Sequence, residues 1–233
     1  IKKGYSDLVI IVDNLDKMVE RIHDKAGCDL PEYMFVRRAA QMTAFECHMI
    51  YTRPISLAYG TSGPIVSQLY GGKLPVLSAV KVSHRPPSTE LYEAGVNKFR
   101  EIIVKRLSSA GAKLEDAFPE NGVLEELIAL SGGQPTELMT LVREAVIADG
   151  LPVGRDALVR AKREGRHEYA RIILKEYEPI LNAVAETGTT PRTEENEDLF
   201  RSLLNSRTIL QYVNDEQWYG LNPMVALLMA KGQ

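Results

Sequence analysis

The stretch Asp7-Leu8-Val9-Ile10-Ile11-Val12-Asp13 decides the fold class. Five apolar residues in a row, bounded by acidic residues, are typical of a strand that is buried on both faces, and parallel sheets are built from such strands. We therefore expect residues 7–12 to form a strand of a parallel sheet that delivers Asp13 at its carboxyl end.

The rest of the first 107 residues continues this pattern. A second strand is predicted at residues 47–51, where Pro54 ends it because proline has no N–H to donate to a sheet ladder. A third strand is expected at residues 76–82. Helices are predicted at about residues 31–44 and 89–107, the latter from apolar positions at helical spacing. Strands that alternate with helices predict an α/β unit over residues 1–107.

After Gly111 the pattern becomes helical only. Helices are predicted at residues 123–130, 135–148 and about 155–164, the second with Pro135 in its first turn. These helices predict a small helical subdomain over residues 108–165.

The last block, residues 166–233, is expected to contain two helices and a hairpin. The first helix covers about residues 168–186 and is ended by Gly188, and the second runs from Thr190-Pro191 to about Asn205. Two short strands, residues 209–213 and 218–221, surround a tight polar turn and predict a hairpin. Helix, helix, hairpin is the order of a winged-helix module.

The composition is typical of a globular protein and favours a cytoplasmic setting. Cys28 and Cys47 are the only cysteines, so neither a disulfide framework nor a metal-ligand spacing is indicated. We expect no membrane partner, because no apolar run approaches the roughly 18 to 20 residues that span a bilayer. The formal net charge of −3 gives no general attraction to nucleic acid.

The candidate site begins with Asp13. An acid at the carboxyl end of a buried strand lies where open α/β sheets bind their ligands, and one carboxylate together with nucleotide phosphates is a typical set of Mg²⁺ ligands. The segment from Leu8 to Lys17 resembles the Walker B motif of AAA+, STAND and KAP-type P-loop ATPases. The resemblance implies that Asp13 is the magnesium ligand of an ATP site. The alternative is that Asp13 terminates a buried strand and binds no ligand.

Two further segments resemble the same families. Thr52-Arg53, at the end of the second strand, is similar to the sensor 1 region, which implies that Thr52 orients water or contacts the γ-phosphate and that Arg53 reads phosphate charge. Residues 129–138 resemble the turn and helix start of an AAA+ lid. This likeness implies a nucleotide contact at Pro135 and, in place of the usual lid arginine, at Arg143. Each segment is also compatible with an ordinary surface arginine or an ordinary helix connection.

The sequence departs from the family pattern at two places in addition to the lid. Asn14 stands where hydrolysing enzymes usually carry a second acid, and its amide cannot accept a proton at neutral pH, which argues against hydrolysis. Asp16 is the fallback candidate for positioning water. The only glycine-rich lysine segment, Gly71-Gly72-Lys73-Leu74, lacks the hydroxyl residue of a phosphate loop. The resemblance places the missing loop on a central strand of the sheet, so we expect an upstream segment of the same protein to supply it.

The resemblance therefore predicts the C-terminal portion of a nucleotide-dependent switch, with residues 1–107 as the distal part of the P-loop core, residues 108–165 as the lid and residues 166–233 as a winged helix. Among families with this layout, the resemblance suggests a bacterial ATPase of regulation or defence. The alternative is a non-catalytic interaction module whose winged helix binds protein or DNA. Residues 166–233 carry 7 Lys and Arg against 10 Asp and Glu, so a protein partner or an oligomer contact is favoured over nucleic acid.

Overall fold

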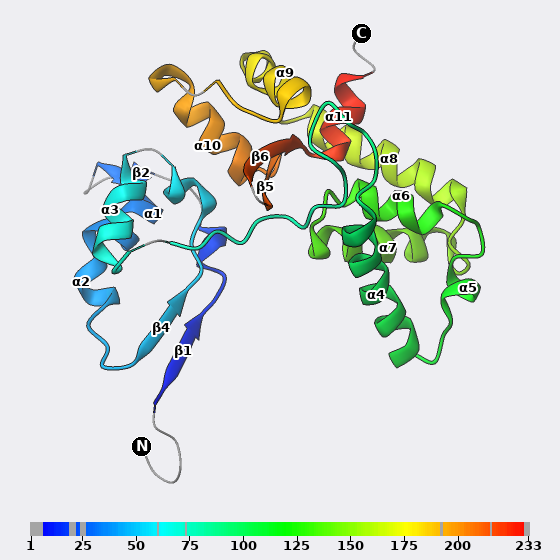
Figure 1. The fold of residues 1–233 in the computed structure, drawn as a ribbon, viewed down its shortest axis with the longest axis horizontal. Helices are drawn as coiled ribbons and strands as arrows, with labels where there is room; N and C mark the ends of the chain where they lie inside the picture. The colour runs from blue at the N-terminus through cyan, green and yellow to red at the C-terminus, as the bar shows by residue number, and fades with distance from the viewer. Residues whose placement is uncertain are drawn as a thin grey trace. The chain divides into compact units, whose positions relative to one another are not determined.

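The computed structural model describes residues 7–18, 22–23, 27–59, 61–72, 74–191, 193–214 and 216–230. The chain divides into two units. Unit 1 contains residues 1–77 together with residues 194–205, and unit 2 contains residues 78–193 and 206–233. The described residues combine many helices with three two-stranded sheets, as expected for a chain of mixed α and β structure (Figure 1).

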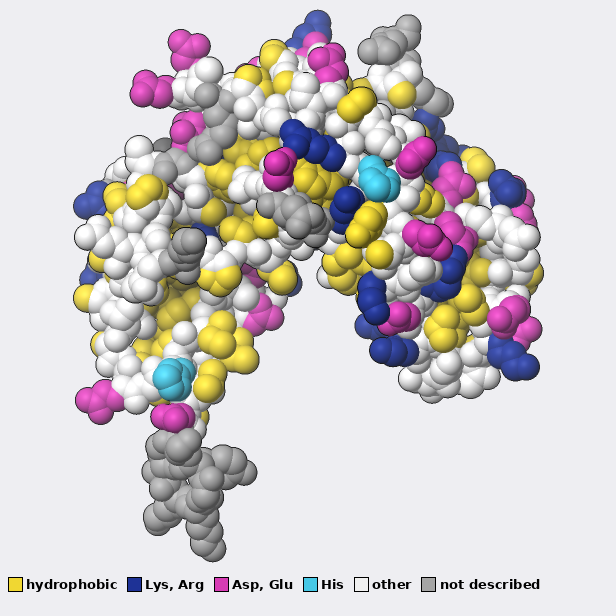
Figure 2. Space-filling model, viewed as in Figure 1, with side chains coloured by type: hydrophobic (Ala, Val, Ile, Leu, Met, Phe, Trp, Pro, Cys, Tyr) yellow, Lys and Arg dark blue, Asp and Glu magenta, His cyan; other side chains and the backbone are white. Residues whose placement is uncertain are grey.

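Unit 1 is built around a parallel pair of strands. β1 (Val9–Val12) pairs with β4 (His48–Tyr51), with Val9 opposite His48 and Val12 opposite Tyr51. Both predicted strands are present, and they form a parallel pair as expected for strands of a parallel sheet. The predicted burial on both faces is wrong, because Leu8 is 54% exposed, Ile11 66% and Ile50 52%. Figure 2 shows hydrophobic side chains at the surface over this sheet.

Short elements complete unit 1. They are the 3-10 helix η1 (Leu15–Lys17), the antiparallel strands β2 (Ile22–His23) and β3 (Cys28–Asp29), the helix α1 (Leu30–Glu32), the π-helix η2 (Tyr33–Arg37), α2 (Ala39–Met42), the 3-10 helix η3 (Ile55–Ala58), α3 (Ser62–Leu69), the 3-10 helix η5 (Glu194–Asn196) and α10 (Glu197–Asn205). Their core centres on the buried side chains of Phe35, Leu57 and Val66. The helix predicted at residues 31–44 is present but broken into three pieces.

The third predicted strand does not form. Residues 74–82 have no strand pairing, and the backbone N–H groups of Ala79 and Val80 donate to two different elements, at Gln211 (3.0 Å) and Gly133 (2.9 Å). Leu77 is 99% exposed, whereas Val82 is buried in the core of unit 2. The apolar run is therefore an extended connection rather than a strand of the β1–β4 sheet.

Unit 2 is mostly helical. Its helices are α4 (Glu93–Ser109), α5 (Leu114–Ala117), α6 (Val123–Leu130), α7 (Pro135–Asp149), α8 (Arg155–Ala170), the 3-10 helix η4 (Lys175–Tyr177), α9 (Glu178–Thr187) and α11 (Pro223–Met229). The strands β5 (Ile209–Asn214) and β6 (Glu216–Leu221) form the predicted antiparallel hairpin. One core joins α4, α6, α7, α8 and α11 and contains Phe99, Leu127, Ile128 and Leu138.

Helix boundaries match the predictions best in the middle of the chain. The helices expected at residues 123–130 and 135–148 are α6 and α7. The single helix expected at residues 168–186 is wrong. The chain is extended at Leu174, and α9 begins a new helix with Pro179 in its first turn, a position that proline favours because its missing N–H has no partner there.

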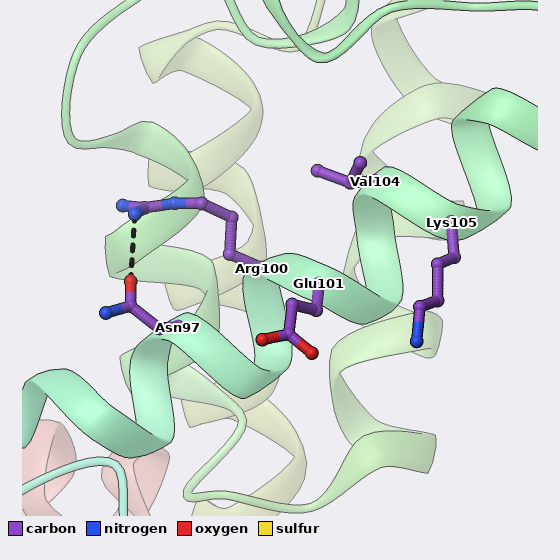
Figure 3. A pocket seen from close by; sticks show the side chains of 5 residues that line it. All are labelled: Asn97, Arg100, Glu101, Val104 and Lys105. Atoms are coloured by element: carbon purple, nitrogen blue, oxygen red, sulfur yellow. Dashed lines mark hydrogen bonds between the residues drawn. The ribbon is translucent and has the colours of Figure 1, made fainter.

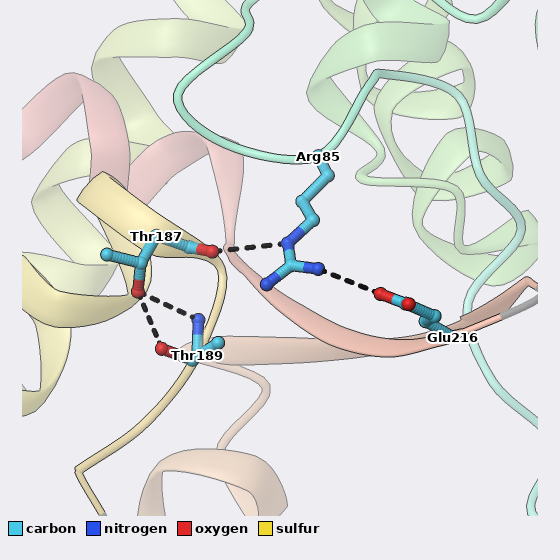
Figure 4. Close-up of polar contacts among 4 residues, drawn as sticks. All are labelled: Arg85, Thr187, Thr189 and Glu216. Atoms are coloured by element: carbon cyan, nitrogen blue, oxygen red, sulfur yellow. Dashed lines mark hydrogen bonds and ion pairs between the residues drawn. The ribbon is translucent and has the colours of Figure 1, made fainter.

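Arg85 connects the loop before α4 to the end of α9 and to β6 (Figure 4). Its Nε donates to the carbonyl oxygen of Thr187 (3.2 Å), and its Nη1 forms an ion pair with Glu216 (3.3 Å). Gly188, which follows Thr187, has φ 67°, and a Cβ atom there would lie 3.1 Å from Arg85 Cγ. The loop, the end of α9 and the hairpin therefore form one packed contact within unit 2. None of the helices in the described ranges has the length and apolar character needed to cross a bilayer.

Candidate functional site

Asp13 and Thr52 lie at the same edge of the parallel sheet. They follow Val12 and Tyr51, which are directly opposite each other in the β1–β4 register. The backbone N–H of Thr52 donates to the carbonyl oxygen of Val12 (3.1 Å), so the pairing extends to the ends of both strands. Two segments separated by almost forty residues are thus brought together where open α/β sheets bind ligands.

The Thr52 hydroxyl has a structural partner. Its Oγ1 accepts a hydrogen bond from the backbone N–H of Leu15 (3.1 Å), the first residue of η1. This bond fixes the turn that follows β1. A hydroxyl oxygen has a second lone pair and its own proton to donate, so Thr52 keeps the capacity to contact a further group.

The Asp13 carboxylate is exposed and has one oxygen engaged. Oδ1 accepts the backbone N–H of Asn14 at 2.7 Å, a local turn that orients the carboxylate. Mg²⁺ is usually held by one or two carboxylates together with phosphate oxygens and water. A single exposed carboxylate at a strand end fits such a site. Within the described residues no group of three or more His, Cys, Asp and Glu side chains is placed to bind a metal ion.

The conformation of Asn14 gives a physical reason for the residue at this position. Its φ is 66° and its ψ is 9°, the left-handed region that asparagine tolerates better than most residues. Its Oδ1 accepts a hydrogen bond from Lys17 Nζ (2.7 Å) across η1. Asp16 is exposed on η1. Asparagine, rather than the acidic residue expected from the resemblance, therefore occupies a position whose left-handed backbone conformation favours asparagine.

Arg53 carries a buried donor. Its Nη1 atom is buried without a hydrogen-bond partner among the described residues, although the residue as a whole is half-buried. Burial lowers the pKa of Arg53 below its ordinary value, and the nearby Tyr59 partly opposes this by raising it. A buried cationic donor without an acceptor is unfavourable, and an anionic ligand would relieve that penalty.

Pro135 and Arg143 belong to unit 2, on α7. Pro135 is the exposed first residue of this helix. The Arg143 side chain is 66% exposed and lies 4.0 Å from the Glu144 carboxylate. An ion pair of this kind contributes little. Thus unit 1 contains Asp13, Asn14, Asp16, Thr52 and Arg53, whereas Pro135 and Arg143, the two residues predicted to lie in a lid, belong to unit 2.

The glycine turn before α7 has a packing role. Gly132 and Gly133 both have positive φ, and a Cβ atom on Gly133 would lie 1.7 Å from the carbonyl oxygen of Val80. The Gly132 carbonyl accepts a hydrogen bond from the buried Tyr212 hydroxyl (2.8 Å). Glycine is required here because the connection before α4 and the β5–β6 hairpin both approach the turn closely.

A separate depression of about 460 Å³ lies along α4 (Figure 3). Asn97, Arg100, Glu101, Val104 and Lys105 line it. Arg100 is engaged by Asn97 (3.0 Å) and by an ion pair with Glu125, and Lys98 pairs with Glu101. Two of its charged groups, Arg100 and Glu101, are thus partnered within unit 2, and none of the predicted site residues lines it.

Two contacts in unit 1 were not predicted from the sequence. Arg201 on α10 forms an ion pair with Asp29 (3.1 Å), and Phe200 packs edge to face against Tyr59. The first pair is separated by 172 residues in the chain, and neither motif nor spacing connects them.

Comparisons with protein-family models, with curated proteins and with solved structures found no match for this chain.

Proposed function

We propose that the chain is the C-terminal part of an AAA+/STAND-type P-loop ATPase and acts as an ATP-binding regulatory switch. One observation carries the proposal: the paired ends of β1 and β4 hold Asp13 and Thr52 at one edge, next to an arginine with a buried, unpartnered donor. A carboxylate, a hydroxyl and a cation at the carboxyl edge of a parallel sheet suit Mg²⁺ and phosphate.

Each residue has a distinct role in this proposal. Asp13 holds Mg²⁺, which neutralises phosphate charge when it is bound. Thr52 contacts the γ-phosphate or the attacking water with the hydroxyl proton that its bond to Leu15 leaves available. Arg53 satisfies its buried donor on a phosphate oxygen. Asn14 argues against hydrolysis, because its amide cannot accept a proton, and this leaves the exposed Asp16 as the fallback for positioning water.

The exposed sheet supports a further part of the proposal. Parallel sheets are normally covered on both faces, yet Leu8, Ile11 and Ile50 are exposed. We propose that an upstream segment of the same protein pairs with this sheet and supplies the phosphate loop. On this proposal residues 108–165 act as the lid, with Pro135 and Arg143 contacting nucleotide, and residues 166–233 act as a winged helix in a cytoplasmic, bacterial regulatory or defence protein.

Calorimetric titration of the natural full-length protein with Mg-ATP tests the proposal. We expect submillimolar binding that depends on magnesium and that Asp13→Ala weakens. Asp16→Ala is the matched control, because Asp16 is an exposed acid in the same segment and is not proposed to bind the metal. Absence of binding, or equal losses in the two variants, would exclude the proposed magnesium site.

The alternative is a non-catalytic module that binds protein or DNA through its C-terminal helices. DNA is disfavoured because α10 begins with Glu197 and Asp198, and acidic residues repel phosphate. Trp218 and Tyr212 stack on each other, with ring centroids 4.1 Å apart, and both are buried, so neither offers a surface for base stacking. A salt-dependent affinity for duplex DNA in the same preparation would favour this alternative.

A further inference from the structure

Residues 75–78 connect the two units without forming a helix or a strand (Figure 1). Before them, Leu74 packs against the core of unit 1. After them, Ala79 packs against the β5–β6 hairpin, and its backbone N–H donates to the carbonyl oxygen of Gln211 (3.0 Å). Both ends of the connection are therefore anchored, each in its own unit.

The connection has the features of a site for limited proteolysis. Leu77 is 99% exposed, and no backbone hydrogen bond joins residues 75–78 to another residue that the structure describes. Proteolytic nicking concentrates where the backbone is exposed and is not held by hydrogen bonds. The Leu77–Ser78 bond follows a large apolar side chain, which a chymotrypsin-like protease accepts.

The helix α10 joins residues 1–77 to the later part of the chain a second time. Residues 194–205, which contain α10, are the only part of the chain after residue 77 that belongs to unit 1. One face of α10 carries three buried apolar residues, Phe200, Leu203 and Leu204. The Phe200 ring lies 5.3 Å from the ring of Tyr59 at an interplanar angle of 88°, an arrangement that is favourable for aromatic pairs.

An ion pair adds to this packing. Arg201 Nη2 lies 3.1 Å from Asp29 Oδ2, and each side chain is only 19% exposed, so the pair is partly shielded from water. Asp29 uses its other oxygen, Oδ1, to cap α1 at the backbone N–H of Glu32 (2.7 Å). Arg201 also lies 3.7 Å from Asp198, which is 97% exposed on α10 itself.

We propose that the connection at residues 75–78 is a proteolytic site, and that α10 is a non-covalent strap that keeps the cut chain together. A chymotrypsin-like protease adds water across the Leu77–Ser78 peptide bond, which leaves a carboxylate on Leu77 and an ammonium group on Ser78. The fragment 1–77 then stays bound to the fragment 78–233 through the contacts that α10 makes with Tyr59 and Asp29. This proposal does not depend on nucleotide binding.

Limited digestion with chymotrypsin, followed by mass spectrometry of the products, tests the proteolytic site. We expect the early products to be one fragment that ends at Leu77 and one that begins at Ser78. Ser78→Pro is the control and is expected to lose this cut, because proline has no N–H and is not accepted on the leaving side of the bond. Early internal cleavage elsewhere, for instance after Phe45, which is 56% exposed, would overturn the assignment of the site.

Size-exclusion chromatography of the cut protein over a dilution series tests the strap. We expect the two fragments to elute together. Phe200→Ala is expected to weaken their association about 100-fold or more, because it removes a fully buried aromatic side chain. Asp29→Asn keeps an oxygen for the α1 cap but leaves Arg201 without its opposite charge, so we expect a loss of about tenfold. Asp198→Asn is the matched control and is expected to leave the association unchanged, because that carboxylate is exposed.

Fragments of the natural sequence that separate after the cut would overturn the strap, and so would equal association in all the variants. Asp29→Asn retains the whole apolar face of α10, so it decides the question even where the loss of Phe200 unfolds unit 1. If chymotrypsin cuts elsewhere, residues 1–77 and 78–233 are expressed together as two chains, and the same dilution series decides whether α10 holds them.

Discussion

The Thr52 hydroxyl oxygen accepts the backbone N–H of Leu15 at 3.1 Å, which ties the end of β4 to the turn after β1. The same turn presents Asp13 and places Asn14 in a left-handed conformation. The geometry of the candidate site therefore depends on a hydrogen bond that is itself part of the fold.

We expect Thr52→Val to destabilise the β1–β4 pair by about 1 to 2 kcal/mol, because the partly buried N–H of Leu15 loses its acceptor. Thr52→Ser keeps the hydroxyl and serves as the control. Hydrogen exchange of the backbone amides in β1 and β4 measures the effect as the free energy of local opening. Equal exchange in the two variants would show that the bond contributes nothing.

The backbone conformation at Asn14 predicts the effect of introducing an acidic side chain at this position. We expect Asn14→Glu to lower the free energy of unfolding by about 1 kcal/mol, because glutamate tolerates the left-handed region less well than asparagine. Asn14→Gly, which adopts positive φ without strain, is expected to be close to neutral. Urea denaturation of both variants makes the comparison, and a glutamate variant as stable as the glycine variant would contradict it.

The turn before α7 predicts a position-dependent effect of adding one methyl group. Gly133→Ala places Cβ 1.7 Å from the Val80 carbonyl oxygen, so we expect a loss of about 3 kcal/mol or more in unfolding free energy. Gly122→Ala is the matched control, because Gly122 also has positive φ but no atom lies within 4 Å of its Cβ position. That variant is expected to lose only about 1 kcal/mol, from the backbone conformation alone.

A difference between these two variants larger than the error of thermal or urea unfolding would support close packing at Gly133. Trp218, buried in the hairpin next to Tyr212, provides a fluorescence signal for unfolding of unit 2. Similar losses in the two variants would mean that Val80 moves away from the turn at little cost.

Glu137 on α7 predicts a pH dependence. Burial raises the pKa of its carboxyl group above the ordinary value of 4.5, Arg207 partly opposes the shift, and Glu144 and Glu168 add to it. The folded state therefore favours the protonated form. The stability that this preference contributes is complete below pH 4.5 and is lost as pH rises through the raised pKa.

We accordingly expect Glu137→Gln to match the natural protein at low pH and to become the more stable of the two as pH rises above 4.5. Urea unfolding at a series of pH values measures the difference. Glu186→Gln, at an exposed position on α9, controls for the change in net charge. A constant difference across the pH series would contradict the assignment.

Local patterns predicted the elements that depend on neighbouring residues. The apolar runs at β1 and β4, the polar turn of the β5–β6 hairpin and the helical periodicity of α6 and α7 each lie within a short window, and all of these elements are present. The apolar run at residues 76–82 was misread as a strand because its apolar residues serve different contacts: Val82 is buried in the core of unit 2 and Ala79 packs against the hairpin cluster, whereas Leu77 is exposed.

The remaining errors involve contacts between distant residues. Nothing in the sequence near Asp29 indicates that Arg201 pairs with it, because the partner is selected by packing of Phe200 on Tyr59 rather than by spacing. The candidate site divides in the same way. Asp13 and Thr52-Arg53 were predicted from strand ends, whereas the burial of the Arg53 donor depends on how the whole of unit 1 packs.

The discontinuous make-up of unit 1 has a consequence for its biosynthesis. As the chain leaves the ribosome, residues 1–77 emerge well before α10, which completes the unit. Until then Asp29 lacks Arg201, and the ring of Tyr59 lacks Phe200. Residues 1–77 are therefore translated before the segment that completes their unit, and a truncation before residue 194 would leave them with an open apolar surface where a chaperone or a protease could act.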